Sequence, residues 1–136
     1  MPIRYRVDHE ARLVVAAGFG RIGDAEVFGY QAEIASRADI RGYDELMDMT
    51  GATGFDVPSP ERVRELARVA ASTDMADSPS RFAIVAPGDA AFGLGRMFQI
   101  HRGLDPRSVR RVGVFRSMDE ALAFLGLEHA PSPPAP

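Results

Sequence analysis

The sequence has 136 residues, a formal net charge of −3 and no cysteine. Its length predicts one domain, the lack of cysteine excludes disulfides and cysteine–zinc sites, and the acidic balance argues against a nucleic-acid-binding surface. Because no apolar run approaches the roughly 18 residues of a membrane span and the N-terminus lacks a signal-peptide pattern, we expect a cytoplasmic protein.

Apolar patterning predicts a chain of alternating strands and helices. Residues 3–7 and 12–17 flank a polar turn, which predicts an antiparallel hairpin. Residues 82–86, F-A-I-V-A, form an unbroken apolar run, which is typical of a strand covered on both faces in a parallel sheet. The other predicted elements are a helix over 24–37, a strand over 43–49, a helix from residue 60, a helix over 89–102, a strand over 109–115 and a helix ending at Gly126.

This order predicts the fold class, a single α/β domain over residues 1–126. We expect a mostly parallel sheet of about five strands with an N-terminal antiparallel hairpin, and four helices on both of its faces. Residues 127–136 carry four prolines and are predicted to be a disordered tail. The predicted helix caps are Asp24, Ser59, Asp89 and Ser117.

Catalytic patterns are scarce in this sequence. The three histidines lack metal-ligand spacing, and neither a cysteine nucleophile nor a G-x-S-x-G elbow is present. Residues 18–23, G-F-G-R-I-G, match a dinucleotide fingerprint formally, but they follow a hairpin strand, so we interpret them as a bend before the cap at Asp24. Asp48 and Asp56 could share a catalytic site, yet nothing supplies a nucleophile. We therefore expect no enzyme activity, cofactor or metal.

The segment 48–59, D-M-T-G-A-T-G-F-D-V-P-S, joins the strand 43–49 to the next helix. Small residues allow backbone N–H groups to face a ligand, and such loops often carry function. The candidate partner or ligand surface in this loop consists of Asp48, Thr50, Asp56 and Ser59. The alternative is that Asp56 and Ser59 only cap the exposed amides of the helix.

The helix 89–102 has interior glycines at positions 93 and 95, each of which costs about 1 kcal/mol relative to alanine. They predict a close approach to the sheet, to another helix or to a ligand. Because the helix is apolar on more than one face, it should pack on more than one partner. Phe92, Arg96 and His101 complete the candidate surface, and both a homodimer contact and a small-molecule pocket beside Arg96 remain open.

The loop 48–59 and the order of elements resemble STAS domains, the SpoIIAA-like fold of bacterial anti-sigma-factor antagonists. Their loop reads D-[L]-[ST]-G-x-x-x-[apolar]-D-[ST]-[ST]-G. The matching residues here are Asp48, Thr50, Gly51, Phe55 and Asp56. The resemblance covers roughly residues 2–126 and implies a non-enzymatic regulatory module that binds another regulatory protein or a second copy of itself.

The loop departs from this pattern where STAS regulators carry the serine or threonine that a partner kinase phosphorylates. Pro58 stands at that position and has no hydroxyl, and Ser59 replaces the following glycine. The resemblance therefore implies a module without the usual phospho-acceptor. A phosphate on Ser59, at a helix N-terminus, would be electrostatically favourable.

The chain also resembles uncharacterised bacterial proteins described as STAS/SEC14-like. The shared stretches are M-P-I-R-Y-R-V-D, A-I-V-A-P, F-G-L-G-R-M-F and V-G-V-F-R-S-M-D-E-A-L-A-F-L-G. This resemblance brings no established activity. Together with the glycine-bearing helix, it implies the alternative function, a carrier or sensor of a small molecule or lipid.

Overall fold

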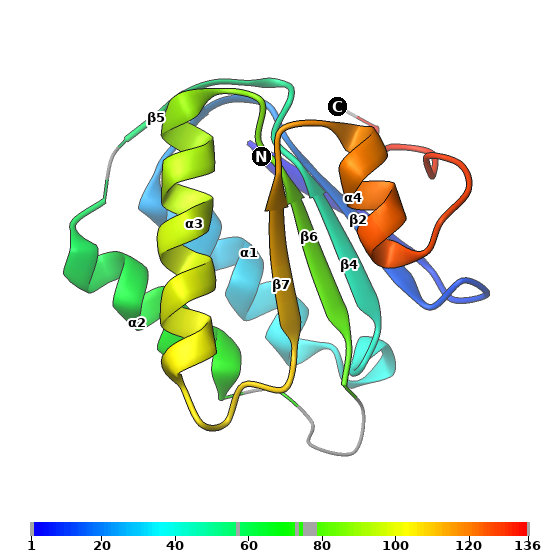
Figure 1. Ribbon diagram of the computed structural model, residues 1–136, viewed down its shortest axis with the longest axis horizontal. Coiled ribbons are helices and arrows are strands. Elements are labelled where there is room, and N and C mark those ends of the chain that lie inside the picture. The colour runs from blue at the N-terminus through cyan, green and yellow to red at the C-terminus, as the bar shows by residue number, and fades with distance from the viewer. Residues whose placement is uncertain (1, 57, 73, 75–78, 136) are drawn as a thin grey trace.

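The computed structural model describes residues 2–56, 58–72, 74 and 79–135. A five-stranded sheet with the order β1-β2-β4-β6-β7 runs through the molecule (Figure 1). Only β1 and β2 pair antiparallel, and the other neighbours in this sheet are parallel, as the alternation of strands and helices predicted. The strands are β1 (Ile3–Asp8), β2 (Leu13–Gly18), β4 (Asp44–Asp48), β6 (Arg81–Val85) and β7 (Arg111–Phe115).

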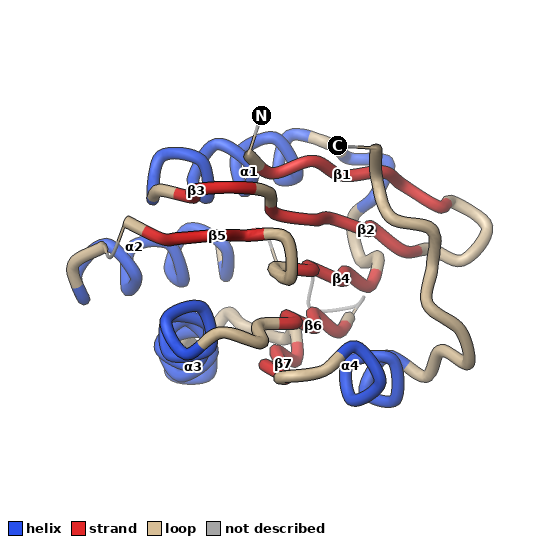
Figure 2. The backbone as a smooth tube through the Cα atoms, turned by 90° about the horizontal axis from the view of Figure 1, so that it is seen from above, coloured by secondary structure: helices blue, strands red, loops and turns tan. Residues whose placement is uncertain are grey.

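Helices cover both faces of this sheet, which confirms the predicted α/β architecture. The helices α1, α2 and α3 lie on one side of the sheet and α4 on the other (Figure 2). Their side chains belong to two separate apolar clusters. Neighbouring residues of β2 alternate between the faces, so Val15 packs on the α4 side and Ala16 on the opposite side. The helices are α1 (Asp24–Ser36), the short 3-10 helix η1 (Ala38–Ile40), α2 (Pro60–Ala71), α3 (Asp89–Leu104) and α4 (Met118–Leu125).

A second sheet of two short parallel strands, β3 (Gly20–Ile22) and β5 (Ala52–Phe55), lies where two loops were expected. The interpretation of residues 18–23 as a bend was therefore wrong, and part of the loop 48–59 is a strand. The amide of Gly20 donates to the Gly51 carbonyl at 3.1 Å, and the two strands supply each other's backbone partners. Both segments are too short to show a periodic pattern in the sequence. They become strands only because they pair with each other in the folded chain.

Helix starts follow the prediction at α2 and α4 but not at α1 and α3. Ser59 Oγ accepts from the amide of Arg62 at 3.2 Å, and Ser117 caps α4 in the same way. At α1 and α3 the cap residues are Gly23 and Gly88, each one residue before the predicted aspartate. The two aspartates are instead the first helical residues, where a negative charge is favoured by the helix dipole.

The last helix, α4, ends at Leu125, one residue before the predicted domain boundary, and the boundary itself stays a prediction. Gly126 closes this helix in the left-handed conformation, with φ 72°. Beyond it, the described residues 127–135 form neither helix nor strand and lead from α4 back toward β1 (Figure 2). Arg6 Nε donates to the Ser132 carbonyl, and Pro134 is buried. Disorder of this tail in solution stays a prediction.

None of the helices in the described part of the chain is long and apolar enough to cross a membrane.

Candidate functional site

Asp48 and Thr50 form a local turn at the end of β4. Asp48 Oδ1 accepts from the Thr50 amide at 2.9 Å and from its hydroxyl at 2.5 Å. An aspartate that binds the backbone two residues on is a common way to reverse the chain. These two candidate residues therefore direct the chain out of the main sheet and into β5.

Asp56 links the two short strands to each other. Its Oδ1 accepts from Arg21 Nε at 2.7 Å and lies 2.5 Å from Nη2, and both side chains are mostly exposed. Asp56 therefore forms an ion pair with Arg21 of β3 and does not cap α2, whose N-cap is Ser59. Asp48 and Asp56 are held by different partners, which gives no support to a shared catalytic site.

The candidate residues of α3 differ in burial: Phe92 is partly buried against the core, whereas Arg96 is exposed. The Phe92 ring lies under the guanidinium of Arg116, with 4.1 Å from Cζ to the ring centre, while exposed Arg96 donates to Gln99 Oε1 at 2.9 Å. His101 is half-buried. Gly95 makes the close approach that the sequence predicted: a Cβ there would lie 2.9 Å from Val114 Cγ1 of β7. Of the three predicted alternatives, this approach is to the sheet.

An apolar cavity of about 140 Å³ lies between α1, α2, α3 and the sheet, away from Phe92, Arg96 and His101. Its lining includes Phe55 and Pro58 of the predicted loop. The other large apolar side chains in its wall are Ile22, Val27, Phe28, Met47, Met49, Val63, Leu66, Phe82, Ile84, Leu94 and Phe98. The small residues Ala91 and Gly95 of α3 also line the cavity. Such a cavity suits an apolar molecule, because it offers few polar partners.

Half-exposed charged residues lie at the edge of this apolar cavity. Arg62 Nε donates to Asp24 Oδ2 at 3.1 Å, Nη1 donates to Glu65 Oε2 at 2.9 Å, and the guanidinium lies 4.2 Å from the centre of the Phe28 ring. The hydrogen bond to Asp24 raises the pKa of Arg62. The Arg62 pairings hold the first turns of α1 and α2 together beside the cavity.

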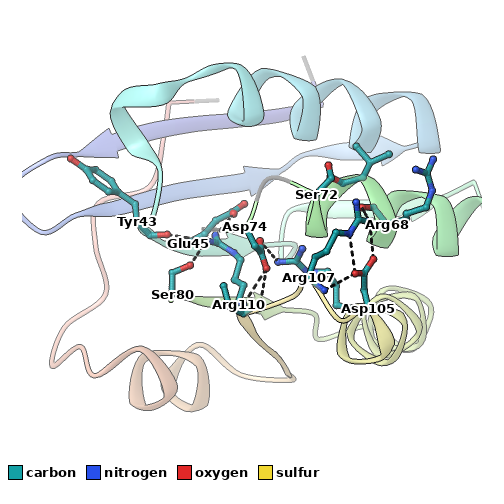
Figure 3. Close-up of polar contacts among 12 residues, drawn as sticks. Tyr43, Glu45, Arg68, Ser72, Asp74, Ser80, Asp105, Arg107 and Arg110 are labelled. Atoms are coloured by element: carbon teal, nitrogen blue, oxygen red, sulfur yellow. Dashed lines mark hydrogen bonds and ion pairs between the residues drawn. The ribbon is translucent and has the colours of Figure 1, made fainter. Parts of the chain in front are cut away.

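A buried polar cluster lies around Glu45 of β4. Glu45 Oε1 accepts from Arg110 Nη2 at 2.6 Å, and Oε2 accepts a short hydrogen bond from the Tyr30 hydroxyl. Arg110 also donates to the Tyr43 carbonyl at 3.0 Å and to Ser80 Oγ at 2.6 Å (Figure 3). Burial, followed by the Glu45 carboxylate, raises the pKa of Tyr30 well above its usual value, so its hydroxyl remains a donor.

A second buried ion pair adjoins this cluster. Arg102 Nη2 of α3 donates to Asp74 Oδ1 at 3.0 Å, and the two side chains are 2% and 6% exposed. Asp74 Oδ2 accepts from the amides of Val109 and Arg110. Burial lowers the pKa of Arg102, and Asp74 opposes that effect.

Sequence reasoning missed the buried cluster. Glu45 shares its strand with Asp44 and Asp48, so the sequence does not show which of the three carboxylates is buried. A buried carboxylate requires a partner, and only the fold identifies Glu45 as the buried one. Its partners Arg110 and Tyr30 could not be assigned, because they come from segments far away in the sequence.

Among the described residues no group of histidine, aspartate and glutamate could hold a metal ion.

The structure is similar to the crystal structure of an uncharacterised protein of the DUF3478 family from Shewanella loihica, which is described as having a SpoIIAA-like fold. The TM-score is 0.51 with 14% sequence identity, over 90% of this chain and 93% of that one. The chain has a SpoIIAA-like fold. The expected STAS-like fold is therefore confirmed, and at this identity the likeness concerns the fold alone. The sequence matches no protein-family model and no curated protein.

Part of the loop 48–59, which resembles the signalling loop of STAS regulators, faces the apolar cavity. Pro58, at the phospho-acceptor position of STAS regulators, lines the apolar cavity. The neighbouring hydroxyl of Ser59 accepts the hydrogen bond that caps α2. Both residues therefore have structural roles in this chain.

Proposed function

We propose that this chain is a non-enzymatic SpoIIAA-like domain that binds a small apolar molecule as a carrier or sensor. The observation that carries the proposal is the cavity of about 140 Å³ with its apolar lining. An apolar cavity of about 150 Å³ stays dry and accepts benzene. A single ring or a short hydrocarbon chain therefore matches the available space.

The cavity wall connects the proposed ligand to the candidate loop. Phe55 and Pro58 line the cavity, whereas Asp48 and Thr50 lie in the turn that precedes β5. A ligand in contact with Phe55 and Pro58 would favour one position of this loop over others. Binding would then alter the surface that the loop offers to a partner.

Filling the cavity tests the proposal. Ala91 lines the cavity, so Ala91→Met places three further heavy atoms in the space that the ligand would occupy. Ala90, its exposed neighbour on the same helix, provides the matched control Ala90→Met. Toluene serves as the probe, with methyl NMR shifts and thermal unfolding as the two measurements.

We expect saturable toluene shifts at Val27, Val63 and Ile84 in the wild type and in Ala90→Met, together with a higher Tm. Ala91→Met should lose both effects. Toluene shifts that do not saturate, or that persist in Ala91→Met, would refute binding in this cavity.

A second candidate function is the protein-interaction module that the STAS resemblance implies, with a second copy or another regulatory protein as partner. It is favoured by Ile100 and Leu104 of α3, whose side chains are 55% and 75% exposed. Exposed apolar side chains one helical turn apart can pack against a helix of a partner protein.

Sedimentation equilibrium tests self-association. A dimer that dissociates in the double variant Ile100→Glu/Leu104→Glu, but not in the cavity variant Ala91→Met, would support the module. A monomer at every concentration would exclude the homodimer and leave only another protein as its partner.

A further inference from the structure

Arg102, in the last turn of α3, has hydrogen-bonding groups without a partner among the described residues. Its side chain is 2% exposed, and Nη2 donates to Asp74. Nε and Nη1 are buried and have no hydrogen-bond partner in the described part of the chain. Buried polar groups are almost always paired, so these N–H groups indicate a missing acceptor.

The neighbouring residues do not offer that acceptor. Asp74 uses both carboxylate oxygens, one for Arg102 and one for the amides of Val109 and Arg110. Glu45 is likewise engaged on both oxygens, by Arg110 and Tyr30. Among the described residues, the carboxylates nearest to Arg102 are therefore already in use.

Arg102 lines a second, polar cavity of about 70 Å³. At about 30 Å³ per molecule, this space holds two waters or one small planar group. The charged residues described in its wall are four arginines and two carboxylates: Arg37, Arg41, Arg102, Arg110, Glu45 and Asp74. Because Arg37, Arg102 and Arg110 each pair with a carboxylate, the excess charge among the described residues is that of Arg41. One excess positive charge favours a singly charged anion over a doubly charged phosphate.

The polar and the apolar cavity are neighbours. Gln31 of α1, Phe82 of β6 and Phe98 of α3 line both of them. The two phenyl rings pack edge to face with their centres 6.2 Å apart. Gln31 is half-buried and lines both spaces, so a ligand that reaches into both would lie against it.

We propose that the ligand is an amphipathic carboxylic acid, with its carboxylate on Arg102 and its apolar part in the cavity between α1, α2 and α3. This inference rests on the proposed function, because it names the chemical class of the same ligand. The carboxylate supplies the acceptors that Nε and Nη1 lack, and hydrogen bonds between charged groups are stronger than neutral ones. The acid is bound as its anion, and no bond is made or broken.

Calorimetric titration with three probes tests the inference: phenylpropionate, its neutral amide phenylpropionamide, and toluene. We expect the wild type to bind the acid about tenfold or more tightly than the amide, which is the scale of a hydrogen bond between charged groups. Arg102→Met should remove this preference and leave the affinity for toluene within about twofold of the wild type. The matched control Arg116→Gln, whose arginine lines neither cavity and pairs with exposed Asp89, should keep the preference.

A second variant and a comparison within the wild type keep the test decisive. If Arg102→Met does not fold, the double variant Arg102→Met/Asp74→Asn removes both charges of the pair and takes its place. The comparison of acid and amide in the wild type needs no variant.

The outcomes separate the two proposals. If toluene binds but acid and amide bind equally, water alone occupies the polar cavity, and this inference is wrong while the proposed function stands. An acid preference that survives the loss of Arg102 also overturns it. If toluene does not bind the wild type, the proposed function itself fails.

Discussion

At the scale of single residues, two polar side chains before α2 have different roles. Ser59 Oγ accepts the Arg62 amide and caps the helix, whereas Asp56 pairs with Arg21 on the neighbouring strand. A helix cap satisfies a backbone donor that has no other partner. An exposed ion pair adds little, because water screens both charges.

Substituting these two residues should therefore have unequal effects. We expect Ser59→Ala to lower the free energy of unfolding by about 1 kcal/mol. Asp56→Ala should lower it by less than about 1 kcal/mol, as for other exposed pairs. Urea unfolding measures both, and a larger loss for Asp56→Ala would mean that Asp56 supports α2 after all.

Asp105, which follows α3, provides a test at low pH. Hydrogen bonds from the Arg107 side chain, followed by the one from the Arg107 amide, lower its pKa to about 2. In the unfolded chain the pKa of an aspartate is about 3.9. The native state therefore holds its proton less tightly than the unfolded state does, and the stabilisation is complete above the unfolded pKa and is lost as the pH falls through the folded pKa.

We expect Asp105→Asn to remove this part of the acid dependence. Its free energy of unfolding should fall less steeply than that of the wild type between about pH 5 and pH 2. In Arg107→Gln, an NMR titration should find the pKa of Asp105 closer to its usual value. Parallel pH profiles for Asp105→Asn and the wild type would contradict the assignment.

At the scale of elements, α3 shows how one helix can carry two glycines in different surroundings. Gly95 faces β7, where a Cβ would lie 2.9 Å from Val114 Cγ1, whereas a Cβ on Gly93 would point into open space among the described residues. The first glycine allows helix and sheet to approach closely. The second has no packing role in the described part of the chain and only weakens the helix.

Alanine at these two positions should therefore change stability in opposite directions. Gly93→Ala should raise the free energy of unfolding by roughly 1 kcal/mol, through helix propensity alone. Gly95→Ala should lower it by up to about 2 kcal/mol, because overpacking costs about 1–3 kcal/mol and the gain in helix propensity offsets about 1 kcal/mol of that. Thermal unfolding of the pair measures the difference, and equal shifts in Tm would show that α3 moves away from β7 without loss.

At the scale of the whole molecule, the buried cluster joins segments that are far apart in the chain. Glu45 in β4 is bound by Tyr30 from α1 and by Arg110 from the segment before β7, and Arg110 also binds Ser80 before β6. Removing one partner of a buried ion pair leaves the other charge without compensation. The cluster therefore fixes the position of α1 and of the segment before β7 relative to the sheet.

Glu45→Ala should consequently reduce the free energy of unfolding by about 3–5 kcal/mol. The exposed pair of Arg116 and Asp89 is the matched control, since the Asp89 side chain is 96% exposed. Asp89→Asn should lower the free energy of unfolding by less than about 1 kcal/mol. If denaturant unfolding gives similar values for the two variants, the cluster does not fix the fold.

The distance along the chain between interacting residues explains which parts of the site could be predicted. Asp48, Thr50 and Ser59 were named as candidates from the loop, and their contacts proved to be local, in a turn and a helix cap. Their place on a functional surface stays a prediction. Asp56 was found as a candidate, but its partner Arg21 was not, since the two come together only when β3 pairs with β5. Arg102 and Glu45 carried no recognisable motif.

The sequence by itself determined the five main strands, the four long helices and their order, because apolar periodicity and caps are local properties of the chain. It also determined the SpoIIAA-like fold through that order. Only the tertiary structure decided the second sheet, the apolar cavity and the unused donors of Arg102. Each of these depends on which distant side chains meet and how much space they leave between them, and no local pattern records either.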